Sequence, residues 1–216
     1  MPASSTFNVF TLKQDLARGI SFLGLDVDED KQNQMLAFLE MLVKWNQAYN
    51  LSGIKDPKKM LSLHLLDSLS ILPYVRGRKI LDVGTGAGLP GIPLAICLPE
   101  SQFSLLDSNG KKMRFVFQSS SSLKLKNIDI IQQRVESYQS RGAFDIVLSR
   151  AFSTLKQMVE RTAHLLAPEG RLLAMKGQLP QQEINEIQEG FRLLDVHELR
   201  LPDETATRHL LELGRQ

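Results

Sequence analysis

A glycine-rich segment, residues 80–91, constrains the fold of this chain more than any other part of the sequence. It reads Ile-Leu-Asp-Val-Gly-Thr-Gly-Ala-Gly-Leu-Pro-Gly, so an apolar run leads into three alternating glycines and then into a proline suited to the first turn of a helix. Glycines let a backbone turn tightly and approach a ligand, and N–H groups at a helix start point toward it. An ordinary tight turn also uses glycines, but the strand–loop–helix context favours a binding loop.

The pattern around this loop predicts an α/β fold. Strands are expected at residues 79–83, 103–106, 128–131, 144–148 and 171–175, and helices at 92–98, 111–123 and 154–166. Such alternation is typical of a parallel sheet with helices on both faces. Two further strand candidates, 191–201 and 208–213, are joined by a turn-like segment at Pro202. We therefore expect a mostly parallel sheet with an antiparallel C-terminal edge.

The first part of the chain has helical signals only. Residues that share one face at the 3.6-residue period are Met35, Leu36, Leu39, Leu42, Val43 and Asn46. Asp56-Pro57 predicts a helix start with proline at the first position, and Pro73 ends that segment. The sequence predicts an N-terminal helical region, residues 1–76, packed on an α/β domain, residues 77–216.

Composition excludes several classes. A lone cysteine, Cys97, permits neither an internal disulfide nor a thiolate metal site. The first residues lack an export-signal pattern, and the most apolar stretch, 89–98, is about half a membrane span. The prediction is a cytoplasmic protein without a metal and without a membrane contact. Its net charge of +2 permits a polyanionic partner but does not require one.

The residues of the loop discriminate between ligands. Leu89 stands where a dinucleotide fingerprint needs glycine, and the lysine of a phosphate-binding P-loop is absent. Asp82 before the glycines would attract the sulfonium and ammonium of S-adenosyl-L-methionine and repel a pyrophosphate. The string resembles the first motif of class I methyltransferases, whose Rossmann-like sheet binds this cofactor, and Gly84 and Gly86 are its candidate contacts.

Two more positions extend the candidate cofactor site. Asp107 ends the second strand, 23 residues after Gly84, where a carboxylate can bind both hydroxyls of a ribose. Its alternative role is a turn or a helix N-cap. Val135 and Glu136 follow the third strand, where this fold holds an adenine, although a plain surface glutamate is the alternative.

Longer motifs resemble one family. They are Leu81 to Leu94, Leu106-Asp107-Ser108, Arg134-Val135-Glu136, Ser149-Arg150-Ala151-Phe152 and Lys176-Gly177-Gln178, with Lys44-Trp45-Asn46, Tyr49-Asn50-Leu51 and His64-x-x-Asp67-Ser68 upstream. The chain resembles the RsmG (GidB) family of bacterial small-subunit ribosomal RNA guanine-N7 methyltransferases over residues 36–213. The resemblance implies methylation of guanine 527 in 16S rRNA, before or within the small ribosomal subunit. It also implies cofactor contacts by Gly84, Leu89, Val135, Glu136 and Arg150.

The chemistry of the residues agrees with that family. Methylation at a pyrimidine carbon needs a cysteine nucleophile, and Cys97 follows the glycine loop instead of the acceptor strand. Methylation of an exocyclic amine uses a proline-rich string that is absent after the fourth strand. Guanine N7 already has a lone pair, so we expect no catalytic base or nucleophile and a target guanine that is unpaired or extruded.

Several roles stay open at the level of sequence. Arg150 ends the fourth strand and needs an anion: the cofactor carboxylate, an RNA phosphate, or Asp82 or Glu136 in an ion pair that only shapes the pocket. Phe152 either stacks on the guanine or belongs to the core.

The basic clusters and the N-terminal motifs are equally open. Lys111, Lys112 and Arg114 form one of several basic clusters that are either solvated or contact phosphate. Trp45 and Tyr49 fit core or inter-domain contacts better than RNA stacking, and His64 with Asp67 fits a structural hydrogen-bond pair.

Two other function classes compete with the rRNA methyltransferase. A small-molecule methyltransferase shares the fold, but the basic clusters and the lack of a long lid-like insertion disfavour it. A non-catalytic RNA-binding module would not need Asp82, the glycine loop and Asp107 together.

Overall fold

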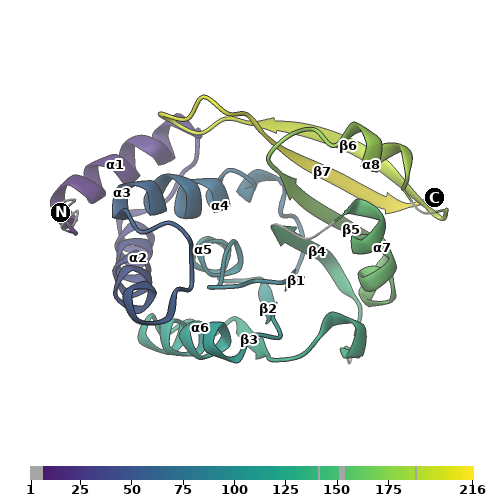
Figure 1. Ribbon diagram of the computed structural model, residues 1–216, viewed down its shortest axis with the longest axis horizontal. Coiled ribbons are helices and arrows are strands. Elements are labelled where there is room, and N and C mark those ends of the chain that lie inside the picture. The colour runs from purple at the N-terminus through teal and green to yellow at the C-terminus, as the bar shows by residue number, and fades with distance from the viewer. Residues whose placement is uncertain (1–6, 141, 151–153, 188) are drawn as a thin grey trace.

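The computed structural model describes residues 7–140, 142–150, 154–187 and 189–216. One sheet runs through the molecule, with helices on both of its faces and the N-terminal helices at one end (Figure 1). Its strands are β1 Lys79–Val83, β2 Gln102–Leu106, β3 Ile128–Ile131, β4 Phe144–Arg150, β5 Leu166–Lys176, β6 Phe191–Leu199 and β7 Arg208–Arg215. The α-helices are α1 Val9–Phe22, α2 Glu29–Tyr49, α3 Pro57–Met60, α4 Asp67–Leu69, α5 Gly91–Cys97, α6 Gly110–Ser122, α7 Leu155–Thr162 and α8 Gln181–Asn185.

The strand order is β3-β2-β1-β4-β5-β7-β6. Strands β1 to β5 pair in parallel, so that Leu81 of β1 lies beside Ser104 on one side and Val147 on the other. β7 runs antiparallel to both β5 and β6. The predicted parallel sheet with an antiparallel C-terminal edge is confirmed. From β1 the sheet extends in one direction through β2 and β3 and in the other through β4 and β5. Such a reversal of strand order opens a crevice at the carboxyl ends of the strands.

Two adjoining predicted boundaries are wrong. The helix expected at 154–166 ends at Thr162 and continues as a short 3-10 turn, η4 Ala163–Leu165. β5 then begins at Leu166, earlier than expected, because a register shift lets Leu166 pair with Phe144 ahead of the main ladder. The remaining 3-10 turns are η2 Leu72–Tyr74 and η3 Val135–Ser137, and α8 is a short helix that the sequence pattern did not indicate.

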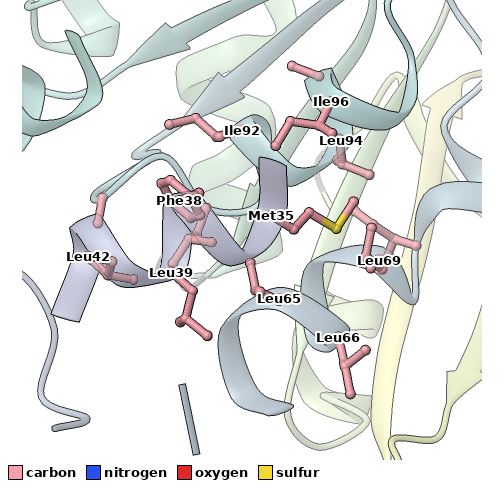
Figure 2. Packing of buried hydrophobic residues seen from close by; sticks show 14 of the residues in the cluster. Met35, Phe38, Leu39, Leu42, Leu65, Leu66, Leu69, Ile92, Leu94 and Ile96 are labelled. Atoms are coloured by element: carbon pink, nitrogen blue, oxygen red, sulfur yellow. The ribbon is translucent and has the colours of Figure 1, made fainter. Parts of the chain in front are cut away.

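A hydrophobic core joins the N-terminal helices to the sheet. Figure 2 shows its side chains converging: Met35, Phe38, Leu39 and Leu42 from α2, Leu65, Leu66 and Leu69 from the following helical run, and Ile92, Leu94 and Ile96 from α5. The predicted face of α2 is confirmed, with Val43 only half-buried. Sequence reasoning missed Phe38, whose ring centroid lies 5.8 Å from that of Phe115 in α6.

The opposite face of the sheet has its own core, since successive residues of a strand point to opposite faces. Leu81 and Val147 lie there with Leu155 and Val159 of α7, whereas Ile80 faces α2, α5 and α6. Within the described parts of the chain, no helix combines the length and the apolar character that crossing a bilayer requires.

Residues 57–69 form one helical run with an irregular centre. Asp56 caps it by accepting a hydrogen bond from the Lys59 N–H at 2.9 Å, and Pro57 occupies the first turn, as predicted. The middle turn, η1 Leu61–Leu66, is a π-helix. Such turns are rare in proteins overall, but those that occur often lie at functional sites. A π-turn inserts one extra residue into the helical register. Here the run places Asp67 and the Leu63 carbonyl against the end of β4.

Because the described residues of the N-terminal helical region and of the α/β domain share a core, we propose that the two regions unfold as one cooperative unit. Phe38→Ala should lower the free energy of unfolding by about 3–5 kcal/mol, since it leaves a cavity between α2 and α6. Denaturant unfolding can be followed by far-ultraviolet circular dichroism and by the fluorescence of Trp45. The two signals should change together in the wild type, and they should also change together in Phe38→Ala. An early, separate transition at Trp45 would contradict the proposal. Phe22→Ala, at an exposed position of α1, is the matched control.

Candidate cofactor and acceptor site

The candidate site lies at the carboxyl edge of the parallel strands, where β1, β2 and β4 end side by side. The Ser149 hydroxyl donates a hydrogen bond to the Val83 carbonyl at 2.8 Å and ties the end of β4 to the end of β1. Residues that follow these strands therefore face one crevice, as the doubly wound topology requires.

The glycine loop is held open toward that crevice. The N–H groups of Gly84 and Thr85 donate to the Leu106 carbonyl at 2.8 and 3.1 Å, which anchors the loop to β2. Gly84, Gly86 and Gly88 all have left-handed φ angles, of 69°, 60° and 80°. A side chain at these positions would strain the backbone. Among the described residues, apart from Gly84 and its two chain neighbours, no heavy atom lies within 4 Å of the place a Cβ would take on Gly84, so a ligand can approach the backbone closely there.

The Asp82 carboxylate lies inside the loop and does not face the crevice. Its Oδ2 accepts hydrogen bonds from the Thr85 hydroxyl at 2.6 Å and from the Gly91 N–H at 2.9 Å. A Cβ on Gly91 would collide with Leu105 and crowd Asp82, so this approach needs glycine. Burial raises the pKa of Asp82 to about 6. We expected this carboxylate to attract the cofactor, but the loop encloses it. In this structure Asp82 has a structural role, which is to hold the loop.

Asp107 connects the glycine loop with the start of α6. Its Oδ2 accepts from the Gly86 N–H at 2.9 Å and its Oδ1 from the Asn109 N–H at 2.8 Å. The helix N-cap is Asn109, which accepts from Lys111 and Lys112, so Asp107 is not the cap. Each carboxylate oxygen keeps a second acceptor position, and the side chain is only half-buried. Asp107 can therefore receive two hydroxyl groups at the edge of the loop.

The other proposed cofactor contacts have different surroundings. The Leu89 side chain is buried, and its N–H donates to the Thr85 carbonyl at 2.9 Å. Val135 is buried against the α7 face of the sheet. The Glu136 carboxylate lies 3.1 Å from Nη1 of Arg161 in α7, so it is a partly exposed, paired side chain. Burial leaves the backbone of Leu89 and Val135 as the available contact, whereas the Glu136 side chain remains partly accessible.

Arg150 has an anionic partner that the sequence did not reveal. Its Nη1 donates to Asp67 Oδ2 and to the Leu63 carbonyl, each at 3.1 Å. Arg208 Nε lies 3.0 Å from Asp67 Oδ1, an ion-pair distance without hydrogen-bond alignment. The alternative of an ion pair with Asp82 or Glu136 is therefore wrong for this structure. Burial raises the pKa of Asp67 despite both arginines.

This ion cluster forms one wall of a cavity of about 210 Å³ at the ends of β4 and β5. The cavity is lined by Asp67, Arg150, Met175, Lys176, Gly177, Leu199, Arg208 and His209. Lys176 Nζ lies 2.9 Å from Glu183 Oε2 of α8. Sequence reasoning missed Arg208 here, since nothing near it in the chain marks it as part of a site.

His64 and Asp67 do not bond to each other, which corrects the expected structural pair. His64 Nε2 lies 2.8 Å from the Ser52 hydroxyl, and burial, with Arg150 nearby, lowers the pKa of His64 to about 4. The imidazole is thus neutral near pH 7 and holds the loop after α2. The Cys97 thiol, whose pKa burial raises to about 12, lies at the end of α5. Phe152 lies outside the described residues.

These groups fit S-adenosyl-L-methionine. The loop offers open backbone at Gly84, and Asp107 offers a carboxylate with free acceptor positions. Arg150 stands at the neighbouring strand end, where an anionic group can join it.

Comparison with known proteins identifies relatives along nearly the whole chain. A family model described as rRNA small subunit methyltransferase G (GidB) matches residues 31–211. A curated protein named ribosomal RNA small subunit methyltransferase G from Stutzerimonas stutzeri is 50% identical over 204 residues, which cover 94% of this chain and 95% of the relative. A protein of the same name from Alteromonas mediterranea is 45% identical over 210 residues, covering 95% and 100%.

Solved structures share the fold at low identity. Magnesium protoporphyrin IX methyltransferase (ChlM) from Synechocystis PCC 6803, with bound SAH, aligns with a TM-score of 0.58 and 16% identity, covering 87% of this chain and 100% of that one. TYW2 from M. jannaschii, in complex with AdoMet, aligns with a TM-score of 0.54 and 14% identity, covering 70% and 76%. These likenesses establish a class I methyltransferase fold.

Asp107 is the side chain whose removal should weaken cofactor binding most. Asp107→Ala should reduce the affinity for S-adenosyl-L-methionine about 10- to 100-fold or more, because each of the lost charge-assisted hydrogen bonds contributes roughly 1.5–3 kcal/mol. Isothermal titration calorimetry measures this, with Asp129→Ala, at an exposed carboxylate of β3, as the control. Equal affinities in two folded variants would show that Asp107 does not contact the cofactor.

Asp82 should make stability depend on pH. Its pKa is raised from 3.8 to about 6 in the folded protein, so folding favours the protonated carboxyl. The contribution of Asp82 to stability is therefore highest below pH 4 and is lost as the pH rises through 6. The shift in pKa corresponds to a loss of about 3 kcal/mol in the free energy of unfolding. Asp82→Asn cannot ionise, so its stability relative to the wild type should increase by most of that amount between pH 4 and pH 7. Denaturant unfolding across this range measures it, and a constant difference between the two proteins would contradict the assignment.

Proposed function

The chain belongs to the rRNA small subunit methyltransferase G (GidB) family, and we propose that it transfers a methyl group from S-adenosyl-L-methionine to N7 of a guanine, guanine 527, in 16S rRNA. The observation that carries the proposal is Asp107, whose carboxylate holds the glycine loop and keeps acceptor positions toward the crevice. We place the reaction in the cytoplasm, on 16S rRNA within or on its way to the small ribosomal subunit.

The residues of the site support an alkylation that needs no base. S-adenosyl-L-methionine, when bound, supplies an electrophilic methyl group. Guanine N7 carries a lone pair and no proton, so the chain has only to orient the base and support the charge that develops on it. Neutral His64 and the Cys97 thiol, held protonated by burial, leave no activated nucleophile among the groups described above.

Arg150 is a positioning residue in this proposal. Asp67 and the Leu63 carbonyl fix its guanidinium at the end of β4, which lowers the entropy lost when it binds a second anion. That anion is the cofactor carboxylate or the phosphate next to the target guanine. Arg208 and Lys176 line the same cavity, so the cations at this place outnumber the carboxylates of Asp67 and Glu183 that pair with them by one. A phosphate-bearing substrate fits this place better than a small neutral acceptor.

One experiment tests the activity together with the role of Arg150. Mass spectrometry of 16S rRNA from cells lacking the protein should show the loss of one methylated guanine, and the wild-type gene should restore it. Purified Arg150→Lys should methylate this rRNA with a kcat/KM about 100-fold below wild type, because a lysine cannot bridge Asp67, Leu63 and a ligand in one plane. Arg192→Lys, at an exposed site on β6, is the control.

The outcomes separate the two claims. An unchanged rRNA in the deletion cells would refute the proposed activity. Wild-type turnover by Arg150→Lys, with the activity itself intact, would refute only the positioning role. Separate titrations with S-adenosylhomocysteine and with rRNA identify the anion, because only the affinity for the true partner should fall.

A further inference from the structure

A series of aromatic rings leads from the core to the surface at the end of α2. The Phe115 ring of α6 lies 5.6 Å from the Trp45 ring, which lies 5.1 Å from the Tyr49 ring, both pairs tilted. Phe115 is fully buried and Trp45 is half-buried, whereas 49% of Tyr49 is exposed. The expectation that both aromatics are core or inter-domain contacts is confirmed for Trp45, which packs on the core, whereas Tyr49 is not a core residue. An exposed ring supported from below is held in one orientation.

The position of Tyr49 follows from how α2 and α6 pack. The Gln34 amide reaches the Leu123 carbonyl at the C-terminal end of α6, while Trp45 reaches Phe115 nearer its start. The helices are therefore antiparallel, and Tyr49, the last residue of α2, lies toward the first turn of α6. That turn directly follows Asp107, so the exposed ring stands at the same edge of the sheet as the glycine loop.

The backbone beneath Tyr49 is also fixed. Asn50 ends α2 in a left-handed conformation. The buried Asn46 amide then binds the loop that follows, donating to the Ile54 carbonyl at 2.8 Å and accepting from the Ser52 N–H at 2.7 Å. The ring consequently loses little freedom when a ligand covers it.

The neighbouring start of α6 carries three cationic side chains, Lys111, Lys112 and Arg114. Among the described residues, no carboxylate lies within 4 Å of the charged groups of Lys111, Lys112 or Arg114. Lys112 Nζ lies 3.7 Å from the place a Cβ would take on Gly86, which connects this charge with the cofactor loop. A preformed aromatic face beside free cations is the combination that binds single-stranded nucleic acid, with bases stacked on the ring and phosphates on the cations.

We propose that Tyr49 and the basic first turn of α6 form a platform for an unpaired nucleotide of the RNA that flanks the target guanine. One base stacks on the exposed face of Tyr49, and Lys111, Lys112 and Arg114 contact the phosphates beside it. The platform rests on the proposed function, because it serves the same RNA at the same edge. It adds a second point of attachment that fixes the direction in which the strand enters the crevice.

The test compares stacking with charge on one substrate, 16S rRNA from cells lacking the protein. Tyr49→Ala should weaken binding of this rRNA about ten-fold, while Tyr49→Phe should bind like the wild type. Neither change should alter the slope of affinity against salt concentration. Replacing Lys111, Lys112 and Arg114 together by glutamine should reduce that slope by about 0.7 for each phosphate that the variant no longer binds. Phe10→Ala, which removes a ring that is 72% exposed on α1, is the control.

Two further measurements exclude a merely structural role. Binding of S-adenosylhomocysteine and the unfolding midpoint should be the same in Tyr49→Ala as in the wild type, and the methylation defect should lie in KM.

Trp45 is the only tryptophan, so the rRNA should quench the intrinsic tryptophan fluorescence of the wild type and of Tyr49→Phe. Equal rRNA affinities for wild type and Tyr49→Ala would overturn the platform. The proposal is also wrong if Tyr49→Ala lowers the affinity for rRNA and the affinity for S-adenosylhomocysteine together. Failure of the wild type to methylate this rRNA refutes the proposed function itself.

Discussion

The buried Asp82 carboxylate is the interaction on which the site depends. It joins the end of β1, the Thr85 hydroxyl in the glycine loop and the first N–H of α5 within one set of hydrogen bonds. Without it, the loop would lose the curvature that presents Gly84 and Gly86 to the crevice, and Asp107 would lose the N–H that orients its own carboxylate. The protein keeps a costly buried acid at this point because the geometry of the cofactor loop rests on it.

A second charged centre joins three parts of the chain that lie far apart in sequence. Asp67 comes from the N-terminal helical run, Arg150 from the end of β4 and Arg208 from the start of the edge strand β7. The helical region therefore lines part of the cavity at the ends of β4 and β5, in addition to covering one face of the sheet. The start of β7 lines the same cavity. We therefore expect the proposed activity to depend on how all three parts pack together.

Local patterns predicted the parts of the molecule that local chemistry determines. The glycine loop, the five parallel strands and the position of Asp107 follow from short runs of residues, and the structure has them as expected. The partner of Arg150 could not be predicted in this way, because Asp67 lies 83 residues earlier and meets it only through the tertiary fold. For the same reason, Asp82 was expected to face the ligand, since its burial depends on how Gly91 and Leu105 pack around it. The exposure of Tyr49 likewise depends on where α2 ends relative to α6.

The π-turn in the helical run shows another way in which a site can be specified. A regular α-helix advances each residue by a fixed angle, so one inserted residue rotates everything after it relative to everything before it. Asp67 faces Arg150 while the start of the same run remains fixed by its cap at Asp56. The direction of this carboxylate therefore depends on the number of residues between the cap at Asp56 and Asp67.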